Sequence, residues 1–318
     1  METPELSVIV PVYNEADCLP SFHAELNSAL KDLRLTHELI FVDDGSTDRS
    51  LEVIAGLQTA DPAVAAVVLS RNFGHQTALT AGLELARGRA VVTLDSDLQH
   101  PPKLIGRLVE EWRKGAMVVH AVREETEGTS ALKDLTSALF YSLINRLSAT
   151  PVRPGAADFR LLDRKAVDAL NSMKERHRFL RGMIGWLGFP EAVVPFKAGA
   201  RAAGKSKYTW RKMLRLAADG IVSFSTKPLR AALWLGLAAL AVNALYAGYV
   251  LYMFFFHDGV IKGWASIVLL AMFLGSAQLI LVGIVGEYVG RIYDEVKARP
   301  LYLVRELRPN RLGASPPR

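Results

Sequence analysis

The feature that most constrains this chain is a pair of long apolar runs near its C-terminal end. Ala231–Phe256 has 26 residues and Gly263–Gly286 has 24, and neither contains a charged side chain. About 20 consecutive apolar residues suffice for a helix to cross the hydrocarbon core of a bilayer. Only His257–Lys262 separates the runs, so we expect a tight transmembrane hairpin. The alternative, a hairpin buried inside a large soluble protein, is disfavoured because both runs are so long.

The charges around this hairpin predict its orientation. Eight Lys and Arg residues lie in residues 201–230 and seven in residues 291–318, whereas the connecting loop has only Lys262. Because such residues concentrate in cytoplasmic segments, both termini and the N-terminal domain are expected in the cytoplasm. The net charge of +6 then fits an anionic membrane surface, and no motif typical of nucleic-acid binding accompanies it. We therefore expect a membrane partner and no nucleic acid.

The cellular compartment follows from two further features. Cys18 is the sole cysteine, so no intramolecular disulfide can form and a reducing compartment is expected. The segment Met1–Glu5 has neither the basic start nor the apolar run of a signal peptide. These features predict a multi-pass protein of the inner (cytoplasmic) membrane.

Two segments flank the hairpin. Lys207–Val222 is basic on one helical face and apolar on the other, so it either lies in the lipid headgroup layer or packs on the N-terminal domain. After the second run, Leu301–Val304 resembles a short strand and is followed by a Pro- and Arg-rich end. We expect this tail either to pair with a neighbouring subunit or to be partly disordered.

The first 125 residues alternate apolar, strand-like runs with helical segments, one of which extends from Glu15 to about Leu33. Runs of this length and spacing predict a parallel sheet with helices on both faces. In such sheets ligands bind beyond the carboxyl ends of the strands, where two acidic clusters of this chain fall. The predicted strands are Leu6–Val12, Glu38–Val42, Val64–Leu69, Arg89–Leu94 and Ala116–Val122.

The first acidic cluster, Asp95-Ser96-Asp97, follows one of these runs. Two carboxylates two residues apart at a strand end can hold a hard divalent cation, to which Gln99 would add a neutral oxygen. Such a cation can neutralise a diphosphate leaving group. The alternative is an Asx turn that caps a helix starting near Pro101-Pro102. This motif alone does not decide between them.

The second cluster, Asp43-Asp44-Gly45-Ser46, ends another run. Its carboxylates can accept hydrogen bonds from a base or a ribose, or the segment is a plain turn followed by a helix cap. Pro11-Val12-Tyr13-Asn14-Glu15 ends the first run. Tyr13 there is suited to pack on a base, and Glu15 to cap a helix or contact a nucleotide.

Together, the segments SVIVPVYNE, FVDDGSTD, LSRNFGHQTALTAGLELARG and TLDSDLQHPP, in this order, resemble glycosyltransferase family 2. ADFRLLDR (Ala157–Arg164), HRFLRGMIGW (His177–Trp186), ARAAGKSKYTWRKM (Ala200–Met213) and the two apolar runs resemble its polyprenyl-phosphate branch. That branch includes bactoprenol glucosyltransferases, the aminoarabinose transferase of lipid A modification and dolichol-phosphate mannose synthases. The resemblance covers nearly the whole chain.

The resemblance implies an α/β fold: a GT-A (Rossmann-like) nucleotide-sugar transferase domain plus a C-terminal two-helix transmembrane hairpin. We expect the catalytic domain in residues 1–200, an amphipathic juxtamembrane segment in 201–228, the hairpin in 229–289 and a cytoplasmic tail in 290–318. The resemblance also implies Mg²⁺ or Mn²⁺, inversion at the anomeric carbon, a polyprenyl-phosphate acceptor and a homo-oligomer, by resemblance a tetramer.

Site residues are carried over by the same resemblance. They comprise a catalytic residue, Asp158; metal ligands Asp95, Asp97 and Gln99; nucleotide-sugar contacts Pro11, Tyr13, Glu15, Asp43, Asp44, Ser70, Arg71 and Asp95; and acceptor or phosphate contacts Arg123, Arg178, Arg201, Lys205, Lys207 and Tyr208. Arg and Lys are the usual phosphate binders, although the basic residues near the membrane are equally suited to lipid headgroups. Arg160 or Arg178 is the nearest expected partner of Asp158.

The chain departs from the family pattern at two places. Relatives often carry a second arginine shortly after the position of Arg123, where this chain has Glu124, Glu125 and Glu127, so Arg123 is the only close candidate there. His177 stands where relatives often have asparagine, and we expect a surface role for it.

Rival functions remain open at this point. A processive polysaccharide synthase usually needs a Gln-x-x-Arg-Trp signature and more spans, and this chain has neither. A non-catalytic scaffold or lipid flippase would not need intact acidic motifs. For the enzyme, UDP-glucose is the favoured donor, followed by UDP-linked amino or N-acetyl sugars and then GDP-mannose.

Overall fold

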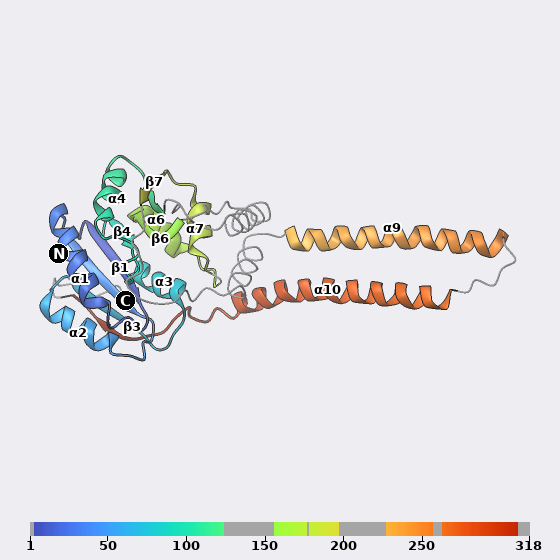
Figure 1. Cartoon of the computed structure of the whole chain (residues 1–318), viewed down its shortest axis with the longest axis horizontal. Helices are drawn as coiled ribbons and strands as arrows, with labels where there is room; N and C mark the ends of the chain where they lie inside the picture. The colour runs from blue at the N-terminus through green and yellow to red at the C-terminus, as the bar shows by residue number, and fades with distance from the viewer. Residues whose placement is uncertain (1–2, 124–155, 177, 197–226, 257–262, 311–318) are drawn as a thin grey trace, which may run out of the picture. The chain divides into compact units, whose positions relative to one another are not determined.

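The N-terminal half of the chain alternates strands and helices, as the sequence predicts (Figure 1). The computed structural model describes residues 3–123, 156–176, 178–196, 227–256 and 263–310. The predicted strands Leu6–Val12 and Val64–Leu69 are confirmed residue for residue, and the other three lie within two residues of their predicted bounds. The elements are β1 (Leu6–Val12), α1 (Leu19–Leu33), β2 (His37–Asp43), α2 (Ser50–Ala60), β3 (Val64–Leu69), α3 (His75–Leu85), β4 (Ala90–Thr93), α4 (Leu104–Arg113) and β5 (Val118–Arg123).

The next described segment adds two strands that make the sheet mixed. It contains β6 (Ala156–Asp163), α6 (Arg164–Ser172), α7 (Leu180–Leu187) and β7 (Glu191–Phe196). The strand order is β7-β5-β6-β4-β1-β2-β3-β8. The predicted parallel arrangement holds for β1 to β4, and β6 runs antiparallel between β4 and β5. This insertion places the start of β6 beside the carboxyl end of β4.

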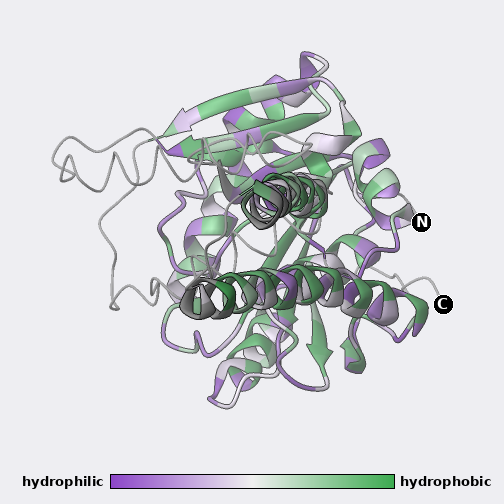
Figure 2. Cartoon of the chain, turned by 90° about the vertical axis from the view of Figure 1, so that its right-hand side faces the viewer, coloured by the Kyte–Doolittle hydropathy of each residue, from purple (hydrophilic) through white to green (hydrophobic). Residues whose placement is uncertain are grey.

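The core explains why these segments form strands. All seven residues of β1 are buried, as are six of the seven in β2, so both faces of the central strands are covered. Figure 2 shows the strands coloured mainly as hydrophobic. Helix α3 packs closely on β1, because a Cβ atom on Gly82 would lie 2.3 Å from Cγ2 of Ile9. A buried, apolar sheet of this kind fixes the loops at its carboxyl edge.

The C-terminal strand corrects one prediction. The tail was expected to pair with a neighbouring subunit or to be partly disordered, but β8 (Val304–Arg308) pairs antiparallel with β3 of its own chain. Leu303 O also accepts a hydrogen bond of 2.8 Å from Ser70 N, and the hydroxyl of Tyr302 donates to Glu84. β8 thus covers the edge that β3 would otherwise expose, and this part of the tail belongs to the sheet rather than to a separate segment.

Two long helices follow the N-terminal part of the sequence. α9 (Lys227–Phe256) and α10 (Trp264–Val296) contain the predicted apolar runs and contact each other. Ala232–Tyr249 and Leu270–Val296 are long and apolar enough to cross a membrane, and none of either window is buried. Outward apolar side chains such as Leu233, Trp234 and Phe273 suit a lipid environment. The predicted amphipathic segment Lys207–Val222 lies outside the described residues.

Candidate active site

The two acidic clusters lie at the carboxyl edge of the parallel strands, as predicted. Val12 of β1 is paired with Asp43 of β2, and Asp95 follows β4 on the other side of β1. The side chain of Tyr13, which follows β1, is 43% exposed at this edge. The loops that follow β1, β2 and β4 therefore lie next to one another at this edge of the sheet.

The loops after β1 and β2 are tied together by side chains of their own motifs. Asn14 Oδ1 accepts a hydrogen bond of 2.8 Å from Thr47 N, and Asp48 Oδ2 accepts one of 3.2 Å from Ala16 N. Glu15 N donates to Ser50 Oγ at 2.9 Å. Asn14 adopts a positive φ of 56°, which asparagine tolerates better than most residues. Residues of the segments VYNE and DDGSTD thus hold these two loops together.

The neighbouring aspartates Asp43 and Asp44 differ in what their carboxylates contact. Asp44 accepts from Phe73 N at 2.7 Å and from Gly74 N at 2.9 Å, so it holds the loop between β3 and α3. Burial raises the pKa of Asp44, against these two hydrogen bonds. Asp43 accepts from Ser46 N at 3.3 Å through Oδ1, whereas its buried Oδ2 has no hydrogen-bond partner within the described residues. Asp43 therefore retains an acceptor for a ligand.

Gly45 brings the same two loops into close contact. Its φ of 68° lies in the left-handed region, and a Cβ atom there would lie 2.5 Å from the carbonyl carbon of Arg71. Arg71 itself is exposed, and its guanidinium carbon lies 4.1 Å from the centre of the Phe73 ring. The predicted nucleotide contacts Ser70 and Arg71 thus lie in the loop that Asp44 and Gly45 hold.

The Asp95–Asp97 motif shows the turn that the sequence analysis kept as an alternative. Asp97 Oδ1 accepts a hydrogen bond of 3.1 Å from Gln99 N, and α4 begins later, at Leu104. This contact engages only one of the two carboxylate oxygens of Asp97, so the turn and a bound cation are compatible. Burial, followed by the charges of Asp158 and Asp97, raises the pKa of Asp95, and His75 and His100 oppose that rise.

The donor set fits a divalent cation. The Asp95 carboxylate is desolvated and lies near the carboxylates of Asp158 and Asp97. A positive ion would therefore stabilise its ionised form. Oxygen donors are what Mg²⁺ and Mn²⁺ prefer. In the described part of the chain no group of three or more His, Cys, Asp or Glu side chains is arranged around a common metal position. A metal here would therefore depend on two carboxylates, on Gln99 and on ligands from elsewhere, such as substrate phosphates.

Asp158 is the most densely hydrogen-bonded carboxylate of this edge. It lies in β6, beside β4, where Thr93 Oγ1 donates to its backbone carbonyl at 2.5 Å. Its Oδ1 accepts from Arg160 Nη2 at 2.6 Å and from Arg181 Nε at 3.1 Å, and its Oδ2 accepts from Arg181 Nη2 at 3.1 Å. Burial alone would raise the pKa of Asp158, but the hydrogen bond from His75 and the charges of Arg160 and Arg181 hold it well below its usual range. Asp158 is therefore ionised at neutral pH and is a weak base.

His75 links this carboxylate to the first acidic motif. Its Nε2 lies 3.4 Å from Asp158 Oδ2 and 3.6 Å from Asp95 Oδ1. Burial lowers the pKa of His75, but the hydrogen bond with Asp158 and the charges of Asp95 and Asp158 raise it overall. The imidazole thus lies between the predicted metal ligand and the predicted catalytic residue.

Three residues of this cluster were missed by the sequence analysis. His75, Gln76 and Arg181 all contact Asp158, Gln76 Nε2 at 3.4 Å. They lie inside the quoted segments LSRNFGHQTALTAGLELARG and HRFLRGMIGW, which is the signal that could have found them. The segments α3 and α7 approach β6 only in the folded sheet, so the spacing along the chain does not reveal the contact.

Other predicted residues are not brought to Asp158. Arg160 is confirmed as its partner, but Arg178 is not, because Arg178 donates to the carbonyls of Leu170 and Met173 at the end of α6. Arg123 is exposed at the end of β5. The predicted contacts Arg201, Lys205, Lys207 and Tyr208 lie outside the described residues.

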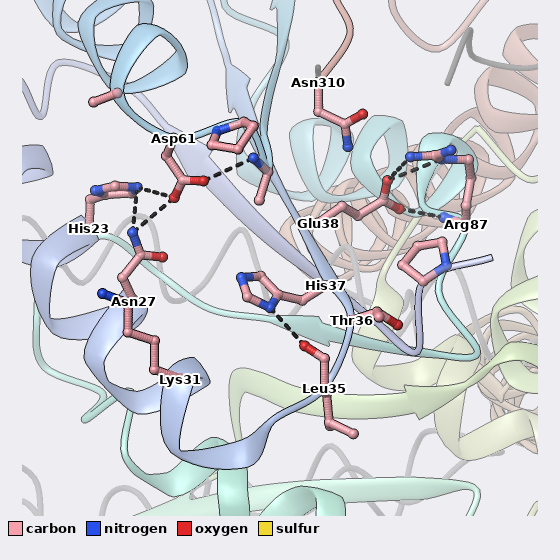
Figure 3. Close-up of a pocket in the computed structure, with 14 residues that line it drawn as sticks. His23, Asn27, Lys31, Leu35, Thr36, His37, Glu38, Asp61, Arg87 and Asn310 are labelled. Carbon is pink, nitrogen blue, oxygen red and sulfur yellow. Dashed lines mark hydrogen bonds and ion pairs between the residues drawn. The ribbon is translucent and has the colours of Figure 1, made fainter. Parts of the chain in front are cut away.

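A separate cavity of about 670 Å³ lies at the opposite, amino end of the parallel strands (Figure 3). Its polar side chains largely pair with one another. His23 Nε2 lies 3.0 Å from Asp61 Oδ2, and Arg87 Nη2 donates to Glu38 Oε2 at 2.5 Å. None of the predicted site residues lines this cavity.

Comparison with known proteins agrees with this geometry. The family described as Glycosyl transferase family 2 matches residues 7–170, which contain both acidic motifs and Asp158. The chain belongs to glycosyltransferase family 2. As a family 2 member it is a transferase enzyme with the expected GT-A type of mixed α/β sheet.

Relatives match over almost the whole chain. An uncharacterized glycosyltransferase of Bacillus subtilis (strain 168) is 41% identical, over 95% of this chain and 94% of that protein. A SfII prophage-derived bactoprenol glucosyl transferase of Shigella flexneri is 37% identical, over 95% of this chain and 98% of that protein. The expected branch of the family is therefore confirmed.

Solved structures are more distant. A mannosyltransferase from Pyrobaculum calidifontis in complex with GDP-Man and Mn²⁺ has 18% identity and a TM-score of 0.48, over 91% of this chain and 88% of that one.

Proposed function

We propose that this family 2 enzyme transfers a hexose from a nucleotide-sugar to polyprenyl phosphate, with UDP-glucose as the favoured donor and undecaprenyl phosphate as the expected acceptor. The observation that carries the proposal is the cluster in which Asp95 and Asp158 both face His75 at the carboxyl edge of the sheet. The full-length similarity to proteins named bactoprenol glucosyl transferases supports the choice of sugar and lipid. The same reaction with GDP-mannose or with a UDP-linked amino or N-acetyl sugar is the alternative.

Residues after β1, β2 and β3 would bind the nucleotide. Asp43 Oδ2, which has no hydrogen-bond partner among the residues that the structure describes, suits an N–H of the base or a ribose hydroxyl, and the exposed ring of Tyr13 suits stacking on the base. Asp44 would act indirectly, because both its oxygens already hold the loop of Ser70 and Arg71. Pro11, Glu15 and Asp95 complete the proposed nucleotide-sugar contacts.

Asp95, Asp97 and Gln99 would hold Mg²⁺ or Mn²⁺. Such a cation supplies positive charge next to the diphosphate that leaves the sugar. The support within this chain is the position of Asp95 and Asp97 after β4, together with the pKa of Asp95, which desolvation and the charges of Asp158 and Asp97 raise, so that a cation would stabilise its ionised form. Asp97 can serve as a ligand through Oδ2 while Oδ1 keeps its hydrogen bond to Gln99 N.

The chemistry needs no strong base. A phosphate monoester has a second pKa of about 6, so the acceptor is largely dianionic at neutral pH. One of its oxygens attacks the anomeric carbon, the bond from that carbon to the diphosphate oxygen breaks, and the nucleoside diphosphate leaves with the electron pair. The acceptor oxygen loses no proton in this sequence. Asp158, with its depressed pKa, is accordingly proposed to position groups and not to remove a proton.

A single displacement of this kind converts an α-linked nucleotide-sugar into a β-linked lipid product. We expect the purified protein, reconstituted with undecaprenyl phosphate, to form such a product most efficiently with UDP-glucose among UDP-glucose, GDP-mannose and UDP-N-acetylglucosamine. Mass spectrometry identifies the lipid-linked sugar, and proton NMR assigns its anomeric configuration. An α-linked product would refute the single displacement, and absence of lipid product with every donor would refute the acceptor.

The membrane arrangement is part of the proposal. α9 and α10 would span the bilayer, with both termini and the catalytic domain in the cytoplasm, on the basis of the charge asymmetry around the hairpin. The acceptor contacts would include Arg123 and the basic residues Arg201, Lys205 and Lys207 with Tyr208. A homo-oligomer, as the family resemblance implies, would place several such hairpins together.

A further inference from the structure

The turn after β4 brings a histidine back to the aspartate with which the first acidic motif begins. His100 Nδ1 lies 3.9 Å from Asp95 Oδ2, and the side chain of His100 is only 14% exposed. Leu98, inside the turn, has a φ of 58°, in the left-handed region, and Pro101 disfavours the helical conformation for the preceding His100. The path of the chain itself therefore directs the imidazole toward Asp95.

The ring of His100 is held in place by two phenylalanines. Its centroid lies 5.7 Å from that of Phe159 in β6 and 5.7 Å from that of Phe196 in β7, which it meets edge to face. The two phenylalanine rings are buried and pack on each other, with centroids 6.5 Å apart. Because aromatic rings at these separations attract one another and fill the space around the imidazole, they oppose its rotation.

The nitrogen of His100 that faces Asp95 is buried, and it has no hydrogen-bond partner among the residues that the structure describes. Leaving a buried polar atom without a partner is unfavourable. The separation of 3.9 Å from Asp95 Oδ2 exceeds a hydrogen bond by about 1 Å. Such contacts are often long in an enzyme without its substrate and shorten in the complex, so Nδ1 is placed to donate to this carboxylate.

The surroundings of Asp95 oppose its charge, so the carboxylate gains from such a donor. Burial is the main cause that raises its pKa, the charges of Asp158 and Asp97 also raise it, and those of His75 and His100 lower it. His75 Nε2 lies 3.6 Å from Oδ1, so the two imidazoles flank the carboxylate, one at each oxygen. Each oxygen has two lone pairs, and the side chain is 30% exposed, so a ligand can still bind it.

We propose that His100 is a positioning residue for the proposed metal site, and that its Nδ1–H orients the Asp95 carboxylate through Oδ2. The inference rests on the proposed function, in which Asp95 is a metal ligand, and it adds a residue that the sequence analysis did not assign. The hydrogen on Nδ1 is present in the charged ring and in one neutral tautomer, so no change of protonation is involved. A carboxylate that is already oriented loses less rotational freedom when it binds a metal.

Equilibrium binding of Mn²⁺ to the full-length protein in detergent, with UDP present, tests this proposal, because EPR measures free Mn²⁺ without any turnover. His100→Phe keeps a ring that can pack on Phe159 and Phe196 but removes both nitrogens. It should weaken Mn²⁺ binding by about tenfold to a hundredfold, the range for residues that orient metal ligands. His100→Asn can place an amide N–H near the position of Nδ1 and should retain most of the affinity. His100→Gln, whose amide lies nearer the position of Nε2, should lose as much as His100→Phe.

His37→Phe is the matched control. His37 is also partly buried and has an Nδ1 contact, 3.0 Å from Leu35 O, but it lies at the amino end of the parallel strands. The control should leave Mn²⁺ affinity unchanged. Melting temperatures show which variants are folded, and the comparison of His100→Asn with His100→Gln decides should His100→Phe be unstable. A role in packing alone would favour His100→Phe over His100→Asn, whereas positioning makes His100→Asn the better metal binder.

Three outcomes would overturn the inference. One is a natural Mn²⁺ affinity in folded His100→Phe, and another is equal affinity in His100→Asn and His100→Gln. The third is direct coordination, which pulsed EPR with isotope-labelled histidine would detect as a strong nitrogen coupling that disappears in His100→Phe. Failure of the proposed function looks different: the natural protein itself would bind Mn²⁺ no better than Asp95→Ala.

Discussion

Asp158 illustrates, at the scale of single residues, how surroundings decide what a carboxylate can do. Its pKa is held low despite burial, by His75, Arg160 and Arg181. Replacing it with asparagine keeps the shape but removes the carboxylate that is hydrogen-bonded to the buried Arg160 at 2.6 Å. Breaking a buried pair in this way typically costs about 3–5 kcal/mol. We therefore expect Asp158→Asn to lower the melting temperature clearly and to reduce turnover through lost positioning.

The pH dependence of Asp158→Asn separates positioning from basicity. If the residue positions groups, the folded variant should keep measurable turnover, and its deficit relative to the natural enzyme should not shrink as the pH rises from 6 to 8. Strong recovery with rising pH would instead identify Asp158 as a base. Because its folded pKa is depressed, its stabilising contribution is present above its unfolded pKa of about 4 and is lost as the pH falls through the folded value. The stability difference between the two proteins should therefore shrink below about pH 4.

Asp97 allows the proposed metal to be tested. Asp97→Ala removes one carboxylate and the hydrogen bond to Gln99 N, which is worth about 1 kcal/mol in a turn. We expect transfer to be abolished, as it should be by EDTA, with only a small change in stability. Asp168→Asn, on the exposed face of α6, is the control and should retain activity and metal response. Full turnover of Asp97→Ala, or of the natural enzyme in EDTA, would contradict the metal assignment.

At the scale of elements, the segment just before β8 contacts a loop of the proposed nucleotide site, since Leu303 O accepts a hydrogen bond from Ser70 N. Burial raises the pKa of the Tyr302 hydroxyl, and its hydrogen bond to Glu84 raises it further. The hydroxyl therefore remains protonated and donates to Glu84. Tyr302→Phe should lower the free energy of unfolding by about 1–2 kcal/mol, since the acceptor is charged. It should also weaken UDP binding modestly, because Leu303 O supports Ser70 N.

A double-mutant cycle with Glu84→Gln provides the check. If the two side chains act on each other, the stability losses of the single variants should sum to more than the loss of the double variant. Strict additivity in thermal or chemical unfolding would show that the contact contributes nothing.

Some elements could be predicted from the sequence because their signals are local. Val64–Leu69 is a short apolar run of six residues, and it forms a strand with the predicted bounds. The partners of β6 and β8 could not be predicted, because strand pairing depends on segments far away in sequence, such as β3 with β8. The same holds for the site. Asp95 and Asp97 follow a strand directly, whereas Arg181 reaches Asp158 only when α7 packs beside β6.

For the whole molecule, the proposed orientation in the membrane can be measured by cysteine labelling. Burial and, to a lesser extent, the charges of Glu15 and Asp17 raise the pKa of the Cys18 thiol. Because the thiolate is the form that reacts with a maleimide, Cys18 would label slowly in either compartment. We therefore propose a Cys18→Ser background. In whole cells, Gly259→Cys between the two spans should react with a membrane-impermeant maleimide. Thr59→Cys, on exposed α2, should react only after the cells are opened. The reverse pattern would show that the orientation is wrong.

The pairing of β8 with β3 also bears on how the protein is made. β3 ends at Leu69, but its edge partner begins at Val304, after both long helices have been synthesised. An emerging chain therefore carries an uncovered strand edge throughout most of translation, a state prone to intermolecular pairing. Chains released before residue 304 would lack the strand that covers this edge. Completion of the sheet thus comes after synthesis of both long helices, so its edge is covered only in chains that have been translated through β8.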